Sequence, residues 1–286
     1  MTMMSPLRRR MIEDMMLRNL SPSTQQSYIY AVAKFSRHFG CSPDRLSLEQ
    51  VRAYQLHLIK QKHSWSHLNQ VACALRFFYG VTLGQAEAFE RIVGGRKPDK
   101  LPLVLNADEI AGLLQAIPGL RNRVALTTAY AAGLRVSEVA RLKVASIDSR
   151  RMLIHIENGK GGRDRYAMLS PRLLEVLRAY WKRGQPGLWL FPGRDPGDHV
   201  AVAALQAACR AARRRARLGK PVTMHTLRHS FATHLLERGI DIRIIQVLLG
   251  HAELDSTARY AQVATNLIAR TASPFDHLSV DVIPPD

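Results

Sequence analysis

RMLIHIENGKGGRDRYAML, at residues 151–169, decides the fold, because strand-like runs here interrupt a chain whose apolar residues otherwise follow helical spacing. The runs 153–156 (LIHI) and 165–168 (RYAM) flank the glycine-rich segment 158–162 (NGKGG). Asn-Gly and Gly-Gly pairs supply the positive φ angles that tight turns between strands require. The stretch therefore predicts a β-hairpin inside a helical protein.

The residues far before this hairpin predict helices with recognisable starts. Within residues 5–90, Ser21, Ser47 and Ser64 each precede a run with apolar residues three and four positions apart. Gln50 completes a capping box with Ser47. About four helices in this segment are enough for a small bundle.

Helical spacing also surrounds the hairpin itself. Asn106 and Glu109 form another capping box, and a helix through Val124 and Tyr130 ends at Gly133. Further helices are expected at 135–143, 171–183, 200–217, 226–238, 241–249 and 254–271. The fold class that follows is mainly α-helical with a small antiparallel β-sheet.

A change of composition predicts a boundary between two domains. The segment 94–102 (GGRKPDKLP) contains two glycines, two prolines and four charges, so it cannot build a core and is typical of a linker. We expect a helical domain, a linker, a domain that contains the hairpin and a tail, at residues 1–92, 93–104, 105–275 and 276–286.

The charge balance points to a polyanionic partner. The 286 residues include 41 Lys and Arg against 23 Asp and Glu, which gives a formal net charge of +18. A charge this far from zero favours nucleic acid as the partner, with an anionic membrane surface as the second candidate. The basic residues that we expect to contact DNA are Arg96, Lys97, Arg163, Arg210, Arg213 and Arg214.

Composition also predicts the compartment. No apolar run reaches the roughly 18 residues of a membrane-spanning helix, and no apolar stretch follows the arginines at 8–10, so we expect neither a span nor a secretory signal. Cys41, Cys73 and Cys209 are odd in number and far apart, which argues against a disulfide framework and against a zinc site. We expect a cytoplasmic, nucleoid-associated bacterial protein without a membrane partner.

The segment 225–229 (HTLRH) carries the strongest sign of chemistry. His225 and Arg228 are three residues apart and share one face of a helix, where an imidazole beside a guanidinium can hold phosphate oxygens. Arg135, at a predicted helix start, is a second anion-binding candidate, and Glu138 lies on its face. Each of these residues alone would be an ordinary surface or core residue, so the interpretation depends on the set.

A metal site is the alternative for this helix. His225 and His229 are four residues apart, as in zinc-binding helices. However, Thr226 stands where such a helix carries its general-base Glu, and Arg228 lies between the two imidazoles. We therefore expect no metal and no other cofactor.

Five motifs together resemble the tyrosine recombinase (phage integrase) family. They are HTLRHSFATH (225–234), LLGH ending at His251, Tyr260, GLRVSEVARL around Arg135, and GKGGR around Lys160. The segment 20–24 (LSPST) with Tyr28 is similar to the SAM-like core-binding domain of that family. The resemblance covers about residues 8–275, and it implies a two-domain DNA clamp with a SAM-like domain followed by a DNA breaking-rejoining catalytic domain.

The resemblance implies a role for each matched residue. Arg135 and Arg228 would bind the non-bridging oxygens of the scissile phosphate, and His225 and His251 would hydrogen-bond to it and assist proton movement. Lys160 would protonate the 5′-hydroxyl leaving group, and Tyr260 would attack to leave a 3′-phosphotyrosine. Glu138 would hold Arg135. A free tyrosine has a pKa of about 10, and clustered cations would favour its phenolate and the transition state.

The resemblance also implies partners and leaves alternatives open. It implies four protomers on two double-stranded recombination sites, exchange through a Holliday junction, and a last segment (about 262–286) that docks on a neighbouring protomer. The segment 263–274 is more like that of mobile-element integrases than of Xer-type dimer resolvases, and an accessory protein would be compatible with either. A type IB topoisomerase-like relaxase and a non-catalytic DNA-binding protein are the alternatives from other classes.

Overall fold

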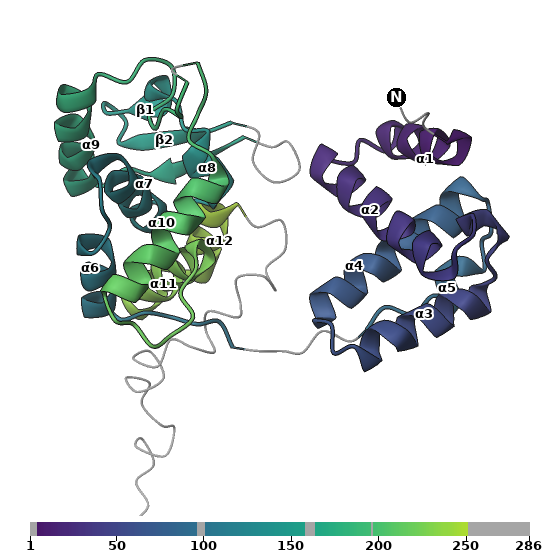
Figure 1. Ribbon diagram of the computed structural model, residues 1–286. Helices are drawn as coiled ribbons and strands as arrows, with labels where there is room; N and C mark the ends of the chain where they lie inside the picture. The colour runs from purple at the N-terminus through teal and green to yellow at the C-terminus, as the bar shows by residue number, and fades with distance from the viewer. Residues whose placement is uncertain (1–4, 96–100, 158–163, 196, 251–286) are drawn as a thin grey trace, which may run out of the picture. The chain divides into compact units, whose positions relative to one another are not determined.

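The computed structural model describes residues 5–95, 101–157, 164–195 and 197–250. The chain divides into two compact units, residues 1–100 and 101–286, which are described one at a time (Figure 1). The predicted residues Arg96, Lys97, Lys160, Arg163, His251 and Tyr260, the predicted helix 254–271 and the tail lie outside the described residues. No helix among the described residues is long and apolar enough to cross a membrane.

The first unit is a small bundle of helices around one core. Phe35, Tyr54 and Tyr79 are buried there, and both tyrosine rings contact Phe35 edge to face. The hydroxyl of Tyr79 donates to the carbonyls of Pro43 (2.7 Å) and Leu46 (3.0 Å). Its elements are α1 (Pro6–Leu17), α2 (Pro22–Phe39), a 3₁₀ turn (Pro43–Arg45), α3 (Leu48–Lys60), α4 (Trp65–Arg76), a π-helical turn (Phe77–Thr82) and α5 (Ala88–Arg91).

The helix starts predicted for this unit are confirmed. Ser21, Ser47 and Ser64 are the N-caps of α2, α3 and α4, and each side chain accepts a backbone N–H of the first turn. The capping box of Ser47 with Gln50 is present. These side chains satisfy donors that a helix N-terminus would otherwise leave unpaired.

The second unit is helical with a small sheet, which confirms the predicted fold class. A three-stranded antiparallel sheet has the order β1-β2-β3 and pairs Ile154 with Ile147 and with Ala167. Its elements are α6 (Ala107–Gln115), α7 (Leu120–Ala131), α8 (Val136–Ala140), a 3₁₀ turn (Val144–Ser146), β1 (Ile147–Asp148), β2 (Leu153–Ile156), β3 (Arg165–Met168), α9 (Pro171–Gly184), α10 (Val202–Arg215), α11 (Met224–Glu237) and α12 (Ile242–Leu249).

Helix α7 lies in the middle of this unit, with α9 on one side and α10 and α11 on the other (Figure 1). Its Leu126 and Ala129 are fully buried in a core that also includes Ile154 of the sheet. Helix α12 packs on α11 and on β3, and its Leu249 is buried beside Phe231. The strand that follows the predicted turn and the helix that precedes His251 are therefore neighbours.

The structure corrects one predicted helix and adds elements that the sequence does not reveal. The helix expected at 135–143 ends at Ala140, because Leu142 and Val144 pair instead with Leu188 and Leu190: Leu190 N donates to Leu142 O, and Val144 N donates to Leu188 O. Strand β1 has only two residues, too few to show alternation. The hairpin strands are confirmed at the predicted residues.

Candidate active site

Arg135 is placed by a sharp turn between α7 and α8. Gly133 has a φ of +62°, and a Cβ there would collide with the ring of Phe231, so glycine is required by conformation and by space. Two residues later Arg135 is the N-cap of α8. Glu138 accepts from the Arg135 backbone N–H (2.7 Å) and from its Nη1 (2.8 Å). This carboxylate therefore fixes both the backbone and the guanidinium of Arg135.

Arg228 comes to the same place from α11. Its side chain is 2% exposed, and its guanidinium donates to the carbonyls of Gly133 (2.7 Å) and Leu249. Its Nη1 lies 3.9 Å from Glu138 Oε2. A buried charge is tolerated only when it is paired and hydrogen-bonded. Here the carbonyls of Gly133 and Leu249 accept hydrogen bonds from the guanidinium, and Glu138 supplies the opposite charge.

Glu138 also binds a third guanidinium, from Arg165 at the start of β3. Arg165 Nη2 donates to Glu138 Oε2 at 2.7 Å, and its Nη1 donates to the carbonyl of Leu248. Burial would raise the pKa of Glu138, but the charges of Arg165 and Arg135 and the hydrogen bonds from Arg135 lower it below its ordinary value. One ionised carboxylate thus sits among three arginines.

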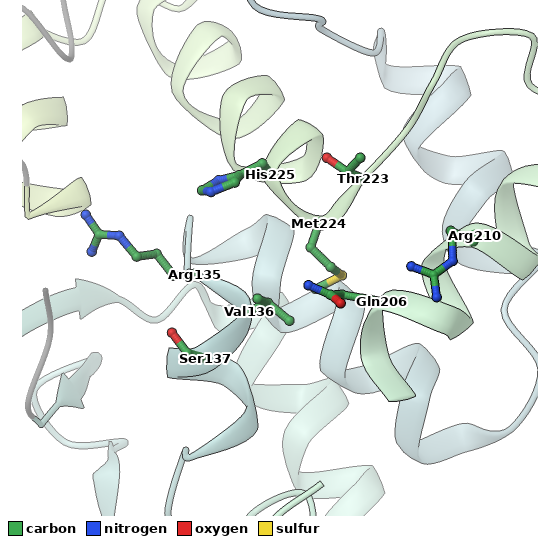
Figure 2. A pocket seen from close by; sticks show the side chains of 8 residues that line it. All are labelled: Arg135, Val136, Ser137, Gln206, Arg210, Thr223, Met224 and His225. Atoms are coloured by element: carbon green, nitrogen blue, oxygen red, sulfur yellow. The ribbon is translucent and has the colours of Figure 1, made fainter. Parts of the chain in front are cut away.

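A cavity of about 440 Å³ opens beside this centre (Figure 2). The Arg135 guanidinium and the His225 ring lie at one end, and Arg210 lies at the other, on the far side of Gln206. Its lining residues are Arg135, Val136, Ser137, Gln206, Arg210, Thr223, Met224 and His225. Two guanidiniums, an imidazole and two hydroxyls on one cavity are suited to bind an anion.

His225 stands in the first turn of α11, where Thr223 caps the helix. Although part of His225 is exposed, partial burial of the ring lowers its pKa, and the positive charges of Arg228 and Arg135 lower it further. The imidazole is therefore mainly neutral near pH 7, able both to donate and to accept a hydrogen bond. Its ring stacks on His229, with the centroids 5.8 Å apart.

The structure brings together the described members of the predicted set: Arg135 and Arg228 meet at Glu138, and Arg135 and His225 share the cavity. Of the predicted DNA contacts on α10, Arg210 and Arg214 are exposed, whereas Arg213 donates to the carbonyl of Leu218. Among the described residues, no three His, Cys, Asp or Glu side chains are grouped so that they could hold a metal ion.

Sequence reasoning missed Arg165. The signal was present, because side chains two residues apart in a strand share a face, and Ala167 is an inward apolar position of the predicted strand. Arg165 therefore had to point inward, toward whatever could neutralise it. The sequence could not tell that this partner is Glu138, 27 residues away.

Comparisons with known proteins cover both units. The model of the Phage integrase family matches residues 104–266, and that of the phage integrase N-terminal SAM-like domain matches residues 7–87. A Sinorhizobium fredii protein named as an integrase/recombinase is 48% identical over 277 residues, covering 96% of this chain and 90% of the relative.

Two further comparisons cover most of the chain. The tyrosine recombinase XerA of Pyrococcus horikoshii is 34% identical, covering 87% of this chain and 86% of the relative. The solved structure of a lambda integrase tetramer bound to a Holliday junction aligns with a TM-score of 0.70 at 19% identity, covering 89% of this chain and 76% of that one. At that identity, the structural match shows a shared fold.

Proposed function

The chain belongs to the phage integrase family of tyrosine recombinases, enzymes that transfer DNA strands, and on this basis we propose that it recombines specific DNA sites through Tyr260. The observation that carries the proposal is that Arg135 meets Arg228 at Glu138 and shares one cavity with His225. The proposed division of labour has residues 1–92 as the core-binding domain and residues 105–275 as the catalytic domain, joined by the linker 93–104.

The proposed first step is an attack of Tyr260 on a DNA phosphate. The phenolate oxygen forms a bond to phosphorus, the bond to the 5′ oxygen breaks, and Lys160 gives that oxygen a proton. Arg135 and Arg228 bind the non-bridging oxygens, whose negative charge grows in the transition state. His225 and His251 donate hydrogen bonds to the same phosphate.

The second step reverses the first on a different strand. The 5′-hydroxyl of a partner strand attacks the 3′-phosphotyrosine, a phosphodiester forms, and the phenol of Tyr260 is released. The covalent intermediate conserves the energy of the broken bond, so rejoining needs no nucleotide. Two such exchanges on two duplexes pass through a Holliday junction, which we propose is held by four protomers, with or without an accessory protein.

Two cellular roles fit the family. An enzyme of a mobile genetic element is the first, and it is compatible with the similarity to a Sinorhizobium protein named as an integrase/recombinase. Similarity to XerA favours resolution of chromosome or plasmid dimers instead. The DNA that flanks the gene separates them: a gene bounded by the ends of a mobile element supports the first role, and a gene without such ends supports the second.

Trapping of a covalent adduct tests the proposed chemistry. The probes are duplexes that the purified protein enriches from a random library, synthesised with nicks tiled along the enriched sequence, so that cleavage near a nick releases a short fragment. Wild type should form a protease-sensitive adduct that survives denaturant, and Tyr260→Phe should bind the same duplexes without forming it.

Tyr30→Phe is the matched control, because Tyr30 is an exposed tyrosine on α2 of the first unit. It should form the adduct as wild type does. An adduct in Tyr260→Phe would show that the nucleophile is another residue. Relaxation of any supercoiled plasmid, without preference for the enriched sequence, would favour a topoisomerase-like activity.

A further inference from the structure

Three guanidiniums from three different elements meet the carboxyl end of α12. Arg165 donates to the carbonyl of Leu248, Arg228 to that of Leu249, and Arg135 to that of Gly250 at 3.3 Å. The last carbonyls of a helix have no partner within the helix and carry partial negative charge. Three successive carbonyls are therefore each bound by a cation, immediately before His251 in the sequence.

Arg165 also binds Glu138, at the carboxylate oxygen opposite the one that the Arg135 guanidinium binds. Its side chain is 10% exposed, and its Nη2 binds the Oε2 atom of Glu138, while Arg135 Nη1 binds Oε1. The two arginines thus hold opposite oxygens of one carboxylate, and the Arg135 backbone N–H shares Oε2 with Arg165. Loss of Arg165 would remove the guanidinium from Glu138 Oε2 and leave that oxygen with the hydrogen bond from the Arg135 backbone N–H, so the carboxylate would be held less firmly.

Gly250 shows how closely Arg165 covers the end of α12. Gly250 has a φ of +61°, and a Cβ placed on it would collide with Cδ of Arg165 and lie 2.9 Å from its Nε. Arg165 cannot retreat without breaking its bonds to Glu138 and to Leu248. The chain that leads into His251 is therefore packed under this side chain.

We infer that Arg165 is a positioning residue for strand cleavage, which holds Glu138 and the carboxyl end of α12 so that Arg135 faces the scissile phosphate. The inference rests on the proposed function, because it gives Arg165 no contact with DNA. Arg165→Met removes one of three cations from Glu138, and Arg135 and Arg228 still compensate part of the buried charge. A planar fork that binds a carboxylate and a carbonyl at once is a property of arginine and not of lysine.

The test compares Arg165→Met, Arg165→Lys and a control, Arg151→Met, which removes an exposed arginine of the turn between β1 and β2. The readout is the single-turnover rate of adduct formation at saturating nicked duplex, alongside DNA affinity. Arg165→Met should form the adduct about 10²-fold more slowly, the loss expected for a small misplacement of a catalytic group, with affinity close to that of wild type. Arg151→Met should match wild type.

The pH dependence separates positioning from a loss of packing. The groups that face Glu138 among the described residues are Arg135 of α8, Arg165 of β3 and Arg228 of α11. Without Arg165 the pKa of Glu138 rises, so the rate should begin to fall at a higher pH in Arg165→Met than in wild type. Arg165→Lys should restore the acid limb, because it restores the charge, while the rate stays below wild type, because one ammonium cannot replace the fork.

Gly250→Ala perturbs Arg165 from the end of α12, because the added Cβ would collide with the Arg165 side chain. This variant replaces Arg165→Met in the test if Arg165→Met is poorly folded. It should slow the adduct step, and the double variant with Arg165→Met should be no slower than the slower single variant. Wild-type rates with an unshifted acid limb in Arg165→Met, or additive losses in the double variant, would overturn the inference while wild type still cleaves. Failure of wild type itself to form an adduct on any duplex would refute the proposed function, and this inference with it.

Discussion

The cores of the two units are built from different kinds of side chain. In residues 5–95 the described buried side chains are aliphatic and aromatic, with Thr82 the polar exception. In residues 101–250 the described buried set includes the ions Glu138 and Arg228. Burying an ion carries a large desolvation penalty, so the second unit retains charges in its interior at a cost in stability that the first unit does not bear.

Arg228 should show the largest effect of this contrast. Arg228→Ala leaves Glu138 short of one cation and the carbonyls of Gly133 and Leu249 without a donor. The free energy of unfolding should fall by about 3–5 kcal/mol, as when one partner of a buried ion pair is removed. Adduct formation on bound DNA should slow by about 10²–10³-fold. Urea unfolding and single-turnover cleavage measure the two effects.

Tyr79→Phe is the counterpart from the apolar core. It removes one hydroxyl that donates to two carbonyls, so it should cost about 1 kcal/mol of stability. It should leave the cleavage rate of bound DNA unchanged. The comparison fails if Tyr79→Phe slows the chemical step as much as Arg228→Lys, a milder variant that keeps the charge.

Glu138→Gln should be next in size, and its effect should depend on pH. The pKa of Glu138 is below its ordinary value of about 4.5, so the ionised carboxylate stabilises the folded protein above that value. This contribution is lost as the pH falls through the lowered pKa. The stability difference between wild type and Glu138→Gln should therefore be largest near neutral pH and shrink as the pH falls below the ordinary pKa of a glutamate.

Glu109→Gln is the matched control for this titration. Glu109 pairs with Lys220 at 2.7 Å on a partly exposed surface, where an ion pair is worth about 0–1 kcal/mol. The hydrogen bond from Lys220 lowers the pKa of Glu109 too, but the pair is partly exposed to solvent, so its substitution should change stability less at neutral pH than Glu138→Gln does and should leave cleavage unchanged. A stability difference for Glu138→Gln that does not vary with pH would mean that the carboxylate is not ionised in the folded protein.

Arg210 should show the smallest effect, because it is exposed and acts on binding. Arg210→Gln should weaken DNA binding and lower the slope of log affinity against log salt by about 1, as expected for one lost phosphate contact. Arg183→Gln, which removes an exposed arginine of α9, should leave that slope unchanged. Equal slopes in wild type and Arg210→Gln would remove Arg210 from the DNA-binding surface.

The features that the sequence predicted well are local ones. A Ser or Asn side chain caps the helix that begins one residue later, so Ser21, Ser47, Ser64 and Asn106 could be assigned without any knowledge of the fold. The hairpin strands were equally evident from their strand-like runs and from the glycines between them. Such signals depend on neighbours along the chain.

The features that could not be predicted from the sequence depend on partners that are distant along the chain. The predicted helix beyond Ala140 gave way because Leu142 pairs with Leu190, 48 residues away. Arg165 went unnoticed because its importance comes from Glu138 and Leu248, which only the fold brings near. Family motifs identified Arg135, His225 and Arg228, but no motif reveals that the end of α12 is bound by three arginines.

The account depends most on Tyr260 as the nucleophile that this charged centre serves, and peptide mapping of the trapped adduct tests that directly. Trypsin should release residues 260–270 (YAQVATNLIAR), in which Tyr260 is the sole tyrosine. After nuclease digestion, mass spectrometry should find a nucleotide on Tyr260, joined through its 3′ phosphate. A nucleotide on any other residue, or one joined through a 5′ phosphate, would contradict the account.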